Sequence, residues 1–287
     1  MDIDKKKLDC PVCNHEARYY NKLKEVTLYY CNHCQHRFTD VESIQNKETY
    51  SQDYFEEKHS NWFAHPNFQL FDYIFDRIKS TGLSNPSVLD AGCGNGDLLK
   101  YLHQRSSNIK LTGIDYHKNS SEEGINFLCG DILHTQFNEQ YDLVISLAVI
   151  EHVLDVQAYI LRLNELCKNK GLVITMTIND SSLVYGVART MYNFGMKTPM
   201  ERLYDKHHLN HFSKNSFACL HKKNSLDIIE KPFTQWPMQS VDFPKNNVLM
   251  KIIYKLALVV LFASEKLLGK SILQTITARK KRLPNPS

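Results

Sequence analysis

The chain has 287 residues, a formal net charge of +4, 43% hydrophobic residues and 23% charged residues. These values are typical of a globular protein with one large domain and room for a small module, and the net charge is too small to indicate a nucleic-acid-binding protein. The positive charge gathers in residues 242–287, which hold nine Lys and Arg against two acidic residues, so the preceding 241 residues sum to −3.

The chain shows no sign of a targeting or membrane-spanning segment. The N-terminal sequence has charged residues without the apolar core of a signal peptide, and no apolar run approaches the ~18–20 residues that cross a bilayer. The eight cysteines form two close pairs and four single residues, which differs from the disulfide framework of a secreted protein. We therefore expect a reduced, cytoplasmic protein with one metal site.

Residues 1–40 carry the paired cysteines. Cys10-Pro-Val-Cys13 and Cys31-Asn-His-Cys34 are two CxxC motifs, separated by 17 residues, and four thiolates can complete the tetrahedral shell of a structural zinc ion. Forty residues have little core of their own, so the metal would stabilise this zinc ribbon. A redox dithiol or a chance pairing is the alternative. We expect three nearby histidines to be solvated: His15, His33 and His36.

Residues 41–80 form a polar, aromatic-rich connector that becomes helical near 68–78. Beyond it, residues 86–180 alternate short apolar runs with amphipathic stretches, which predicts strand–helix units and a parallel sheet. The expected strands are Ser87–Ala91, Lys110–Asp115, Asn126–Cys129, Tyr141–Ala148 and Leu172–Thr177, and the expected helices are Asp97–Gln104 and Val156–Asn169.

A glycine-rich loop follows the first of these strands, in the sequence VLDAGCGNG at 88–96. Glycines let the backbone turn sharply and let a ligand approach, and the helix that opens at Asp97 offers unpaired N–H groups. Dinucleotide-binding folds use a nearly identical loop, and a turn with no ligand is a further alternative. Asp115 ends the second strand, where an acid can accept both ribose hydroxyls. Asp131 and Ile132 follow the third strand and suit an adenine.

These segments, together with YDLVISLAVIEHV at 141–153, resemble the four motifs of the class I S-adenosylmethionine-dependent methyltransferases, in the family's order, over residues 86–180. The last motif is similar to that of enzymes of the ubiquinone-biosynthesis type. The resemblance implies a Rossmann-like α/β fold with a seven-stranded sheet whose last strand is antiparallel. It also implies S-adenosylmethionine as the cofactor, held by Asp90, Gly92, Gly94, Asn95, Gly96, Asp115, Asp131, Ile132, Leu147 and Ala148.

The N-terminal segment resembles the zinc ribbons that precede the methyltransferase domain in some bacterial enzymes of sugar and surface-glycan modification. Those enzymes often carry a Tyr-x-x-x-Tyr-Phe segment between the two parts, and residues 50–55 are consistent with it. Tyr54 could close over the cofactor, or it could be part of an aromatic hinge.

Two places offer a histidine that could remove a proton from the acceptor. His152 follows the fourth strand, at the edge where open α/β sheets bind ligands. His208 and His211 match a His-Leu-x-x-Phe-Ser stretch of related enzymes. His211 could instead be a hydrogen-bonded structural residue, Ser213 could simply cap the next helix, and Phe212 could pack into the core. Glu151 could contact the substrate or cap the following turn.

The remaining residues, 181–287, are less regular. We expect an inserted lid at 181–212, a helix near Lys214–Asn224, strands near Asp227–Lys231 and Ile272–Ala278, and an amphipathic helix at 247–268. This helix has a wide apolar face, and basic residues continue to 282. Residues 247–282 could therefore touch an anionic inner-membrane surface, or pack against the domain or a second subunit. The expected division is a ribbon at 1–40, a connector at 41–80 and a methyltransferase domain at 81–287.

The leading hypothesis is methyl transfer from S-adenosylmethionine to a small-molecule, sugar-linked or lipid-linked acceptor, with a histidine as base. The alternatives are an RNA or protein methyltransferase, a non-catalytic cofactor-binding module, and a nicotinamide oxidoreductase. Nucleic acid is disfavoured because the basic segment lies far along the chain and no Asn/Asp-Pro-Pro-Tyr motif follows the fourth strand.

Overall fold

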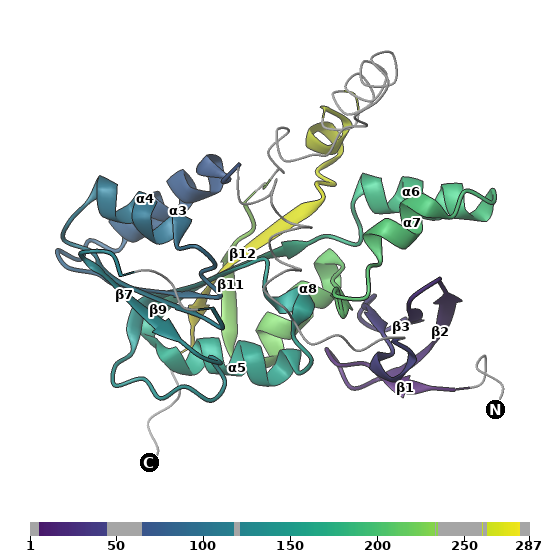
Figure 1. The fold of residues 1–287 in the computed structure, drawn as a ribbon, viewed down its shortest axis with the longest axis horizontal. Helices are drawn as coiled ribbons and strands as arrows, with labels where there is room; N and C mark the ends of the chain where they lie inside the picture. The colour runs from purple at the N-terminus through teal and green to yellow at the C-terminus, as the bar shows by residue number, and fades with distance from the viewer. Residues whose placement is uncertain are drawn as a thin grey trace.

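A computed structural model describes residues 6–44, 65–117, 121–232, 234, 260 and 263–281 of the chain (Figure 1). Residues 50–55, with Tyr54, lie outside these described residues. So does most of the expected amphipathic helix, of which residues 260 and 263–268 are helical. None of the described helices is long and apolar enough to cross a membrane.

The central sheet has seven strands in the order β11-β12-β9-β8-β5-β6-β7 (Figure 1). The strands are β5 (Ser87–Ala91), β6 (Lys110–Asp115), β7 (Ile125–Cys129), β8 (Tyr141–Leu147), β9 (Cys167–Ile178), β11 (Leu226–Glu230) and β12 (Leu273–Lys280). Strands β5 to β9 pair in parallel, whereas β12 is antiparallel to both of its neighbours. The predicted seven-stranded α/β fold with an antiparallel last strand is confirmed.

Helices cover both faces of this sheet. On one face, α3 (Phe68–Ser80) and α4 (Asp97–Arg105) bury their apolar stripes against side chains such as Val88 and Ile145. On the other face, α5 (Val156–Leu166) and α8 (Lys214–Lys223) pack over Leu89 and Val144. Strands buried on both faces read as continuous apolar runs, and this explains why the expected strands match the observed ones within about two residues at most ends.

The expected helix over 156–169 ends three residues early. Cys167 adopts extended backbone angles and begins β9, where it pairs with Tyr141 of β8. The register then shifts, so that Leu143 pairs with Leu172 and the intervening residues form an irregular start to the strand. The amphipathic pattern continues through this region, but sheet pairing determines the backbone there.

The N-terminal ribbon is a small antiparallel sheet, and one of its strands comes from the large domain. Its own strands are β1 (Leu8–Asp9), β2 (Glu16–Lys22), β3 (Thr27–Tyr30) and β4 (Arg37–Thr39), followed by the short helix η2 (Val41–Ser43). The fifth strand is β10 (Asn210–His211), which pairs antiparallel with β4. Residues of two distant parts of the sequence therefore share one sheet.

Two helices separate β9 from β10 and project from the sheet in Figure 1: α6 (Leu183–Asn193) and α7 (Thr198–Leu203). Ser182 caps α6 by accepting a hydrogen bond from the Tyr185 N–H, and Pro199 lies in the first turn of α7. Phe194, between the helices, is highly exposed. These helices occupy most of the segment expected to form a lid.

Candidate functional site

The glycine loop joins β5 to α4 through left-handed backbone turns, which glycine adopts without steric cost. Gly92 and Gly96 have φ angles of +78° and +76°. The N–H groups of Gly92 and Cys93 both donate to the carbonyl of Ile114, at 2.8 and 3.1 Å, and the Gly94 N–H donates to Asp115 Oδ2 at 2.9 Å. These three hydrogen bonds connect the loop to the end of β6.

Both glycines also lie too close to neighbouring side chains to carry a β-carbon. A β-carbon on Gly92 would lie 2.4 Å from Val149 Cγ2, and one on Gly96 would lie 2.6 Å from the Phe127 ring. Glycine is therefore required at these positions for packing as well as for backbone angle.

A hollow lies beside this loop, at the carboxyl ends of β5, β8 and β9. It is lined by Pro66, Asn67, Leu70, Phe71, Asp90, Gly92, Cys93, Gly94, Asn95, Asp97, Leu98, Leu147 and Met176. Five of the residues expected to hold the cofactor are among these: Asp90, Gly92, Gly94, Asn95 and Leu147.

Negative charge dominates the hollow. Asp90 is buried, and this burial, followed by the nearby carboxylates of Asp115 and Asp97, raises the pKa of Asp90 to about 7. A cationic ligand would relieve this repulsion, whereas the diphosphate of a dinucleotide would increase it. The arrangement therefore favours a ligand with positive charge near Asp90.

The other residues expected to hold the cofactor do not line this hollow. Asp115 accepts the Gly94 N–H, and Asp131 accepts the Leu133 N–H at 2.9 Å and lies 2.8 Å from His134 Nδ1. Ile132 is packed into the core, and Ala148 has a φ angle of +56°. Gly96 begins the turn into α4.

The sequence did not indicate the wall that α3 contributes. Asn67 caps this helix by accepting the Leu70 N–H, and Leu70 and Phe71 face the hollow. An asparagine directly before an amphipathic stretch could have located the start of the helix, but not the surface that it covers.

The three candidate bases lie near one another: the ring centroid of His208 is 4.8 Å from that of His152 and 6.4 Å from that of His211. His152 ends the short helix η3 (Ile150–His152), and its Nδ1 lies 2.8 Å from the His207 carbonyl oxygen. His211 is fully buried against Tyr204, and burial lowers the pKa of His211 to about 3. His152 and His208 are partly exposed, as a base that meets a substrate must be.

The residues next to these histidines have structural partners. Glu151 is buried and accepts a hydrogen bond from Thr177 Oγ1 at 2.8 Å, and burial raises its pKa to about 7. Ser213 caps α8 by accepting the Ser216 N–H, and Phe212 is fully buried. The structural alternatives for Ser213 and Phe212 are thereby confirmed.

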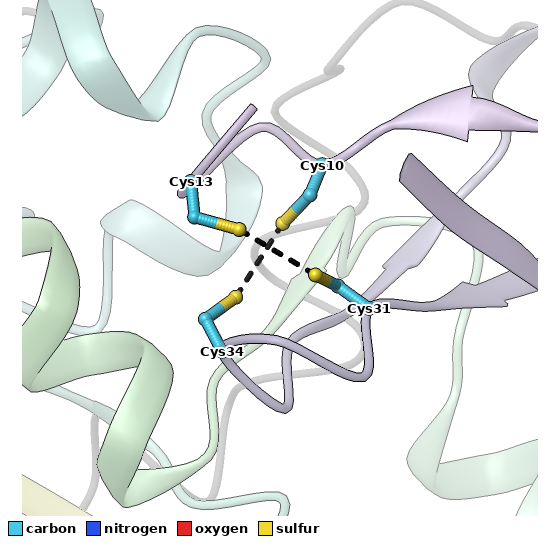
Figure 2. Close-up of side chains that lie close together, drawn as sticks. All are labelled: Cys10, Cys13, Cys31 and Cys34. Carbon is cyan, nitrogen blue, oxygen red and sulfur yellow. Dashed lines mark hydrogen bonds between the residues drawn. The ribbon is translucent and has the colours of Figure 1, made fainter. Parts of the chain in front are cut away.

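The four paired cysteines meet at one point between the ribbon's two CxxC turns. Figure 2 shows their side chains converging, with Sγ distances of 3.5 Å for Cys10–Cys34 and 3.4 Å for Cys13–Cys31. All four sulfur atoms lie within 4.8 Å of one another and all four residues are buried. Thiolates around a tetrahedral zinc ion are about 3.8 Å apart, since each Zn–S bond is about 2.3 Å, so this set of donors fits zinc.

One ribbon histidine differs from the expectation. His15 and His33 are exposed and their rings stack at 3.7 Å, but His36 is fully buried, with Nε2 3.2 Å from Asn210 Oδ1. The expectation that His36 is solvated was wrong because it ignored the large domain that covers this side of the ribbon. Burial lowers the pKa of His36 to about 4.

The chain matches known proteins over this same region. A family model described as "Methyltransferase domain" matches residues 63–231, more than half of the chain. A ubiquinone biosynthesis O-methyltransferase of Rickettsia bellii is 33% identical over 138 residues, which cover 43% of this chain and 57% of that protein. A malonyl-[acyl-carrier protein] O-methyltransferase of Acetivibrio thermocellus is 28% identical, over 46% of this chain and 51% of that protein. The matches thus span about half the length of these curated relatives.

Solved structures share the fold. A 1,6-didemethyltoxoflavin-N1-methyltransferase of Burkholderia thailandensis, with bound S-adenosylhomocysteine, has a TM-score of 0.51 at 11% identity, over 92% of this chain and 99% of that one. Magnesium protoporphyrin IX methyltransferase of Synechocystis, also with bound S-adenosylhomocysteine, has a TM-score of 0.50 at 16% identity, over 80% and 98%.

Proposed function

Because the chain belongs to the methyltransferase-domain family, we propose that it transfers the methyl group of S-adenosylmethionine to a small-molecule acceptor. The observation that carries this proposal is the acidic hollow beside the glycine loop, where Asp90 lies buried near Asp97 and Asp115. S-adenosylmethionine carries a sulfonium and an ammonium group, which suit this negative charge. A nicotinamide dinucleotide, the competing ligand, carries a diphosphate that does not.

We propose that each part of the cofactor contacts a different group of residues. Asp90 and the glycine loop would hold the methionine part, Asp115 the ribose, and Asp131 with Ile132 the adenine. Leu147 and Ala148 would lie on the sulfonium side. When bound, the cofactor would supply an electrophilic methyl carbon for in-line displacement.

The protein's own part in the reaction is to place the acceptor and to take its proton. His152 follows β8, at the carboxyl edge of the sheet where this fold class binds its ligands, and the His208 ring lies 4.8 Å from that of His152. Either imidazole could act as a base near neutral pH. His211 is a weaker candidate because burial lowers its pKa to about 3, which makes it a poor proton acceptor, and keeps it away from the surface.

We also propose that the four cysteines hold a structural zinc ion. Four thiolates complete a tetrahedral shell and leave no position for a substrate, so the ion would stabilise the ribbon and take no part in methyl transfer.

The acceptor class is proposed more finely from the family resemblance and from the relatives' names: a small sugar-linked or lipid-linked molecule, with the enzyme in the cytoplasm. The O-methyltransferase relatives are named for ubiquinone biosynthesis and for malonyl-[acyl-carrier protein].

The proposed membrane contact of residues 247–282 lies mostly outside the described residues. Acidic substitutions on the apolar face of residues 247–268, followed by a liposome-binding assay, would test it.

Calorimetry with the full chain tests the central proposal. S-adenosylhomocysteine should bind and NAD should not; the reverse result, or no binding of the former, would contradict it. His152→Gln and His208→Gln should keep this binding. Release of S-adenosylhomocysteine in the presence of nucleotide-linked sugars or of quinol-type phenols then identifies the acceptor class, and at least one of the two variants should lose that turnover.

A further inference from the structure

The candidate base His208 lies in a segment that forms hydrogen bonds with the ribbon. The Thr39 N–H donates to the Leu209 carbonyl at 2.9 Å, and Thr39 Oγ1 donates to the His208 carbonyl at 3.2 Å. From the other side, the Leu209 N–H donates to the Glu151 carbonyl at 2.8 Å. The backbone after His208 is therefore fixed between the ribbon and the end of β8.

The same segment also orients the side chain of the second candidate base, His152. His152 Nδ1 lies 2.8 Å from the carbonyl oxygen of His207, one residue before His208. The two rings are 4.8 Å apart. A shift of the backbone at residues 207–209 would thus move His208 and remove the contact that orients the ring of His152.

Thr39 can hold this segment because the ribbon is itself firmly attached to the large domain. The Arg37 guanidinium lies against the rings of both Tyr20 and Tyr30, at 4.6 and 4.5 Å from their centroids, and pairs with the buried Asp180. Arg189 binds the other oxygen of the same carboxylate at 3.1 Å.

Side chains beside the metal site add further attachments. Gln157 of α5 donates to the carbonyl oxygens of Pro11 and Val12, and Ser213 Oγ donates to that of Cys34. Both CxxC turns therefore contact helices of the large domain.

We propose that Thr39 is a positioning residue for the candidate bases: the ribbon, through the Thr39 hydroxyl and strand β4, sets the backbone that carries His208 and orients His152. This inference rests on the proposed function for its chemical meaning, since it assigns the ribbon to the acceptor side of the site. The cofactor hollow contains no ribbon residue among those described, so the ribbon should affect acceptor geometry without affecting cofactor binding.

Three variants of the full, zinc-loaded chain test this. Thr39→Val removes the hydroxyl donor and keeps the shape, Thr39→Ser keeps the donor, and Thr27→Val makes the same change on β3, which does not pair with β10. Zinc content reports whether each ribbon is folded, and Thr39→Ala replaces Thr39→Val should the latter lose its metal.

In Thr39→Val, amide exchange at Leu209 should be about five- to tenfold faster than in the wild type, because the His208 carbonyl of the same peptide group loses a donor. The NMR signals of the His208 and His152 rings, assigned with the two His→Gln variants, should shift. Thr39→Ser and Thr27→Val should match the wild type. Affinity for S-adenosylhomocysteine should stay within about twofold in all of them, since cofactor contacts are untouched.

Equal exchange rates and ring signals in Thr39→Val and Thr39→Ser would overturn the inference. Failure of the wild type to bind S-adenosylhomocysteine would instead contradict the proposed function, and the exchange and ring measurements would still decide whether Thr39 sets this segment.

Discussion

The side chain of Val149 packs directly over Gly92, so closely that a β-carbon on the glycine would lie 2.4 Å from Val149 Cγ2. Gly92→Ala should therefore displace the loop. The left-handed backbone angle alone costs an alanine about 1–2 kcal/mol. We expect affinity for S-adenosylhomocysteine, measured by calorimetry, to fall at least about tenfold.

Gly186→Ala is the matched control for this change. Gly186 lies in α6 with nothing near the position of an added β-carbon, so alanine there should leave binding unchanged and stabilise the helix by about 0.5–1 kcal/mol. Equal binding by the two variants would show that the loop does not hold the cofactor.

The raised pKa of Asp90 predicts a pH dependence of cofactor binding. Ionised Asp90 should attract the cofactor's ammonium group, and with a pKa of about 7 it goes from about one-tenth ionised at pH 6 to about nine-tenths at pH 8. Affinity for S-adenosylhomocysteine should therefore rise about tenfold over this interval, with proton release on binding near neutral pH.

The same shift has the opposite effect on stability. A carboxyl whose pKa is higher in the folded state than its usual value binds more protons when folded, so the free energy of unfolding falls as pH rises from about 4 to about 7. Asp90→Asn should flatten both dependences. Glu151→Gln, at a second buried acid with a raised pKa that does not line the hollow, should keep the dependence of binding. A flat binding profile in the wild type would refute the assignment of Asp90.

Cys34→Ser should remove the metal. We expect about one zinc ion per chain in the wild type by elemental analysis, and close to none in the variant, together with a lower unfolding temperature, because metal binding stabilises so small a sheet. Cys219→Ser, at a partly buried cysteine of α8 outside the cluster, should keep the zinc. A metal-free wild type would exclude the site.

Arg37→Met should loosen the ribbon. Asp180 is 1% exposed and would lose one of its two cationic partners while it keeps Arg189, so we expect a cost of about 1.5–3 kcal/mol, the value of a hydrogen bond to a charged group. The loss should be visible in urea unfolding. Arg18→Met, the same change at an exposed position of β2, should cost less than about 0.5 kcal/mol. Similar losses in both variants would mean that the buried pair does not anchor the ribbon.

Local sequence patterns predicted the elements that are buried on both faces. Strands β5 and β6 have the expected bounds because apolar runs there end in an acid at the edge of the sheet. The resemblance to the methyltransferase motifs named five residues that line one hollow. The strand bounds depend on residues close together in the sequence, where backbone preference and burial agree.

Pairing between distant segments could not be predicted in this way. Strand β10 has only two residues, so it carries no periodic pattern, and its partner β4 lies about 170 residues earlier. The bond between Arg37 and Asp180 joins residues 143 positions apart. The buried state of His36 follows from the same docking, which no pattern within residues 1–40 reveals.

The pairing of β4 with β10 also covers one edge of each strand. Sheet edges with unpaired N–H and C=O groups attract other chains, and here β4 and β10 satisfy each other's edge. A variant that lacks residues 1–40 would leave β10 without its partner strand. It would also expose the apolar residues that now pack in one cluster with Phe38 and Tyr29. We therefore expect a chimaera with a foreign ribbon to need a strand that pairs with this edge.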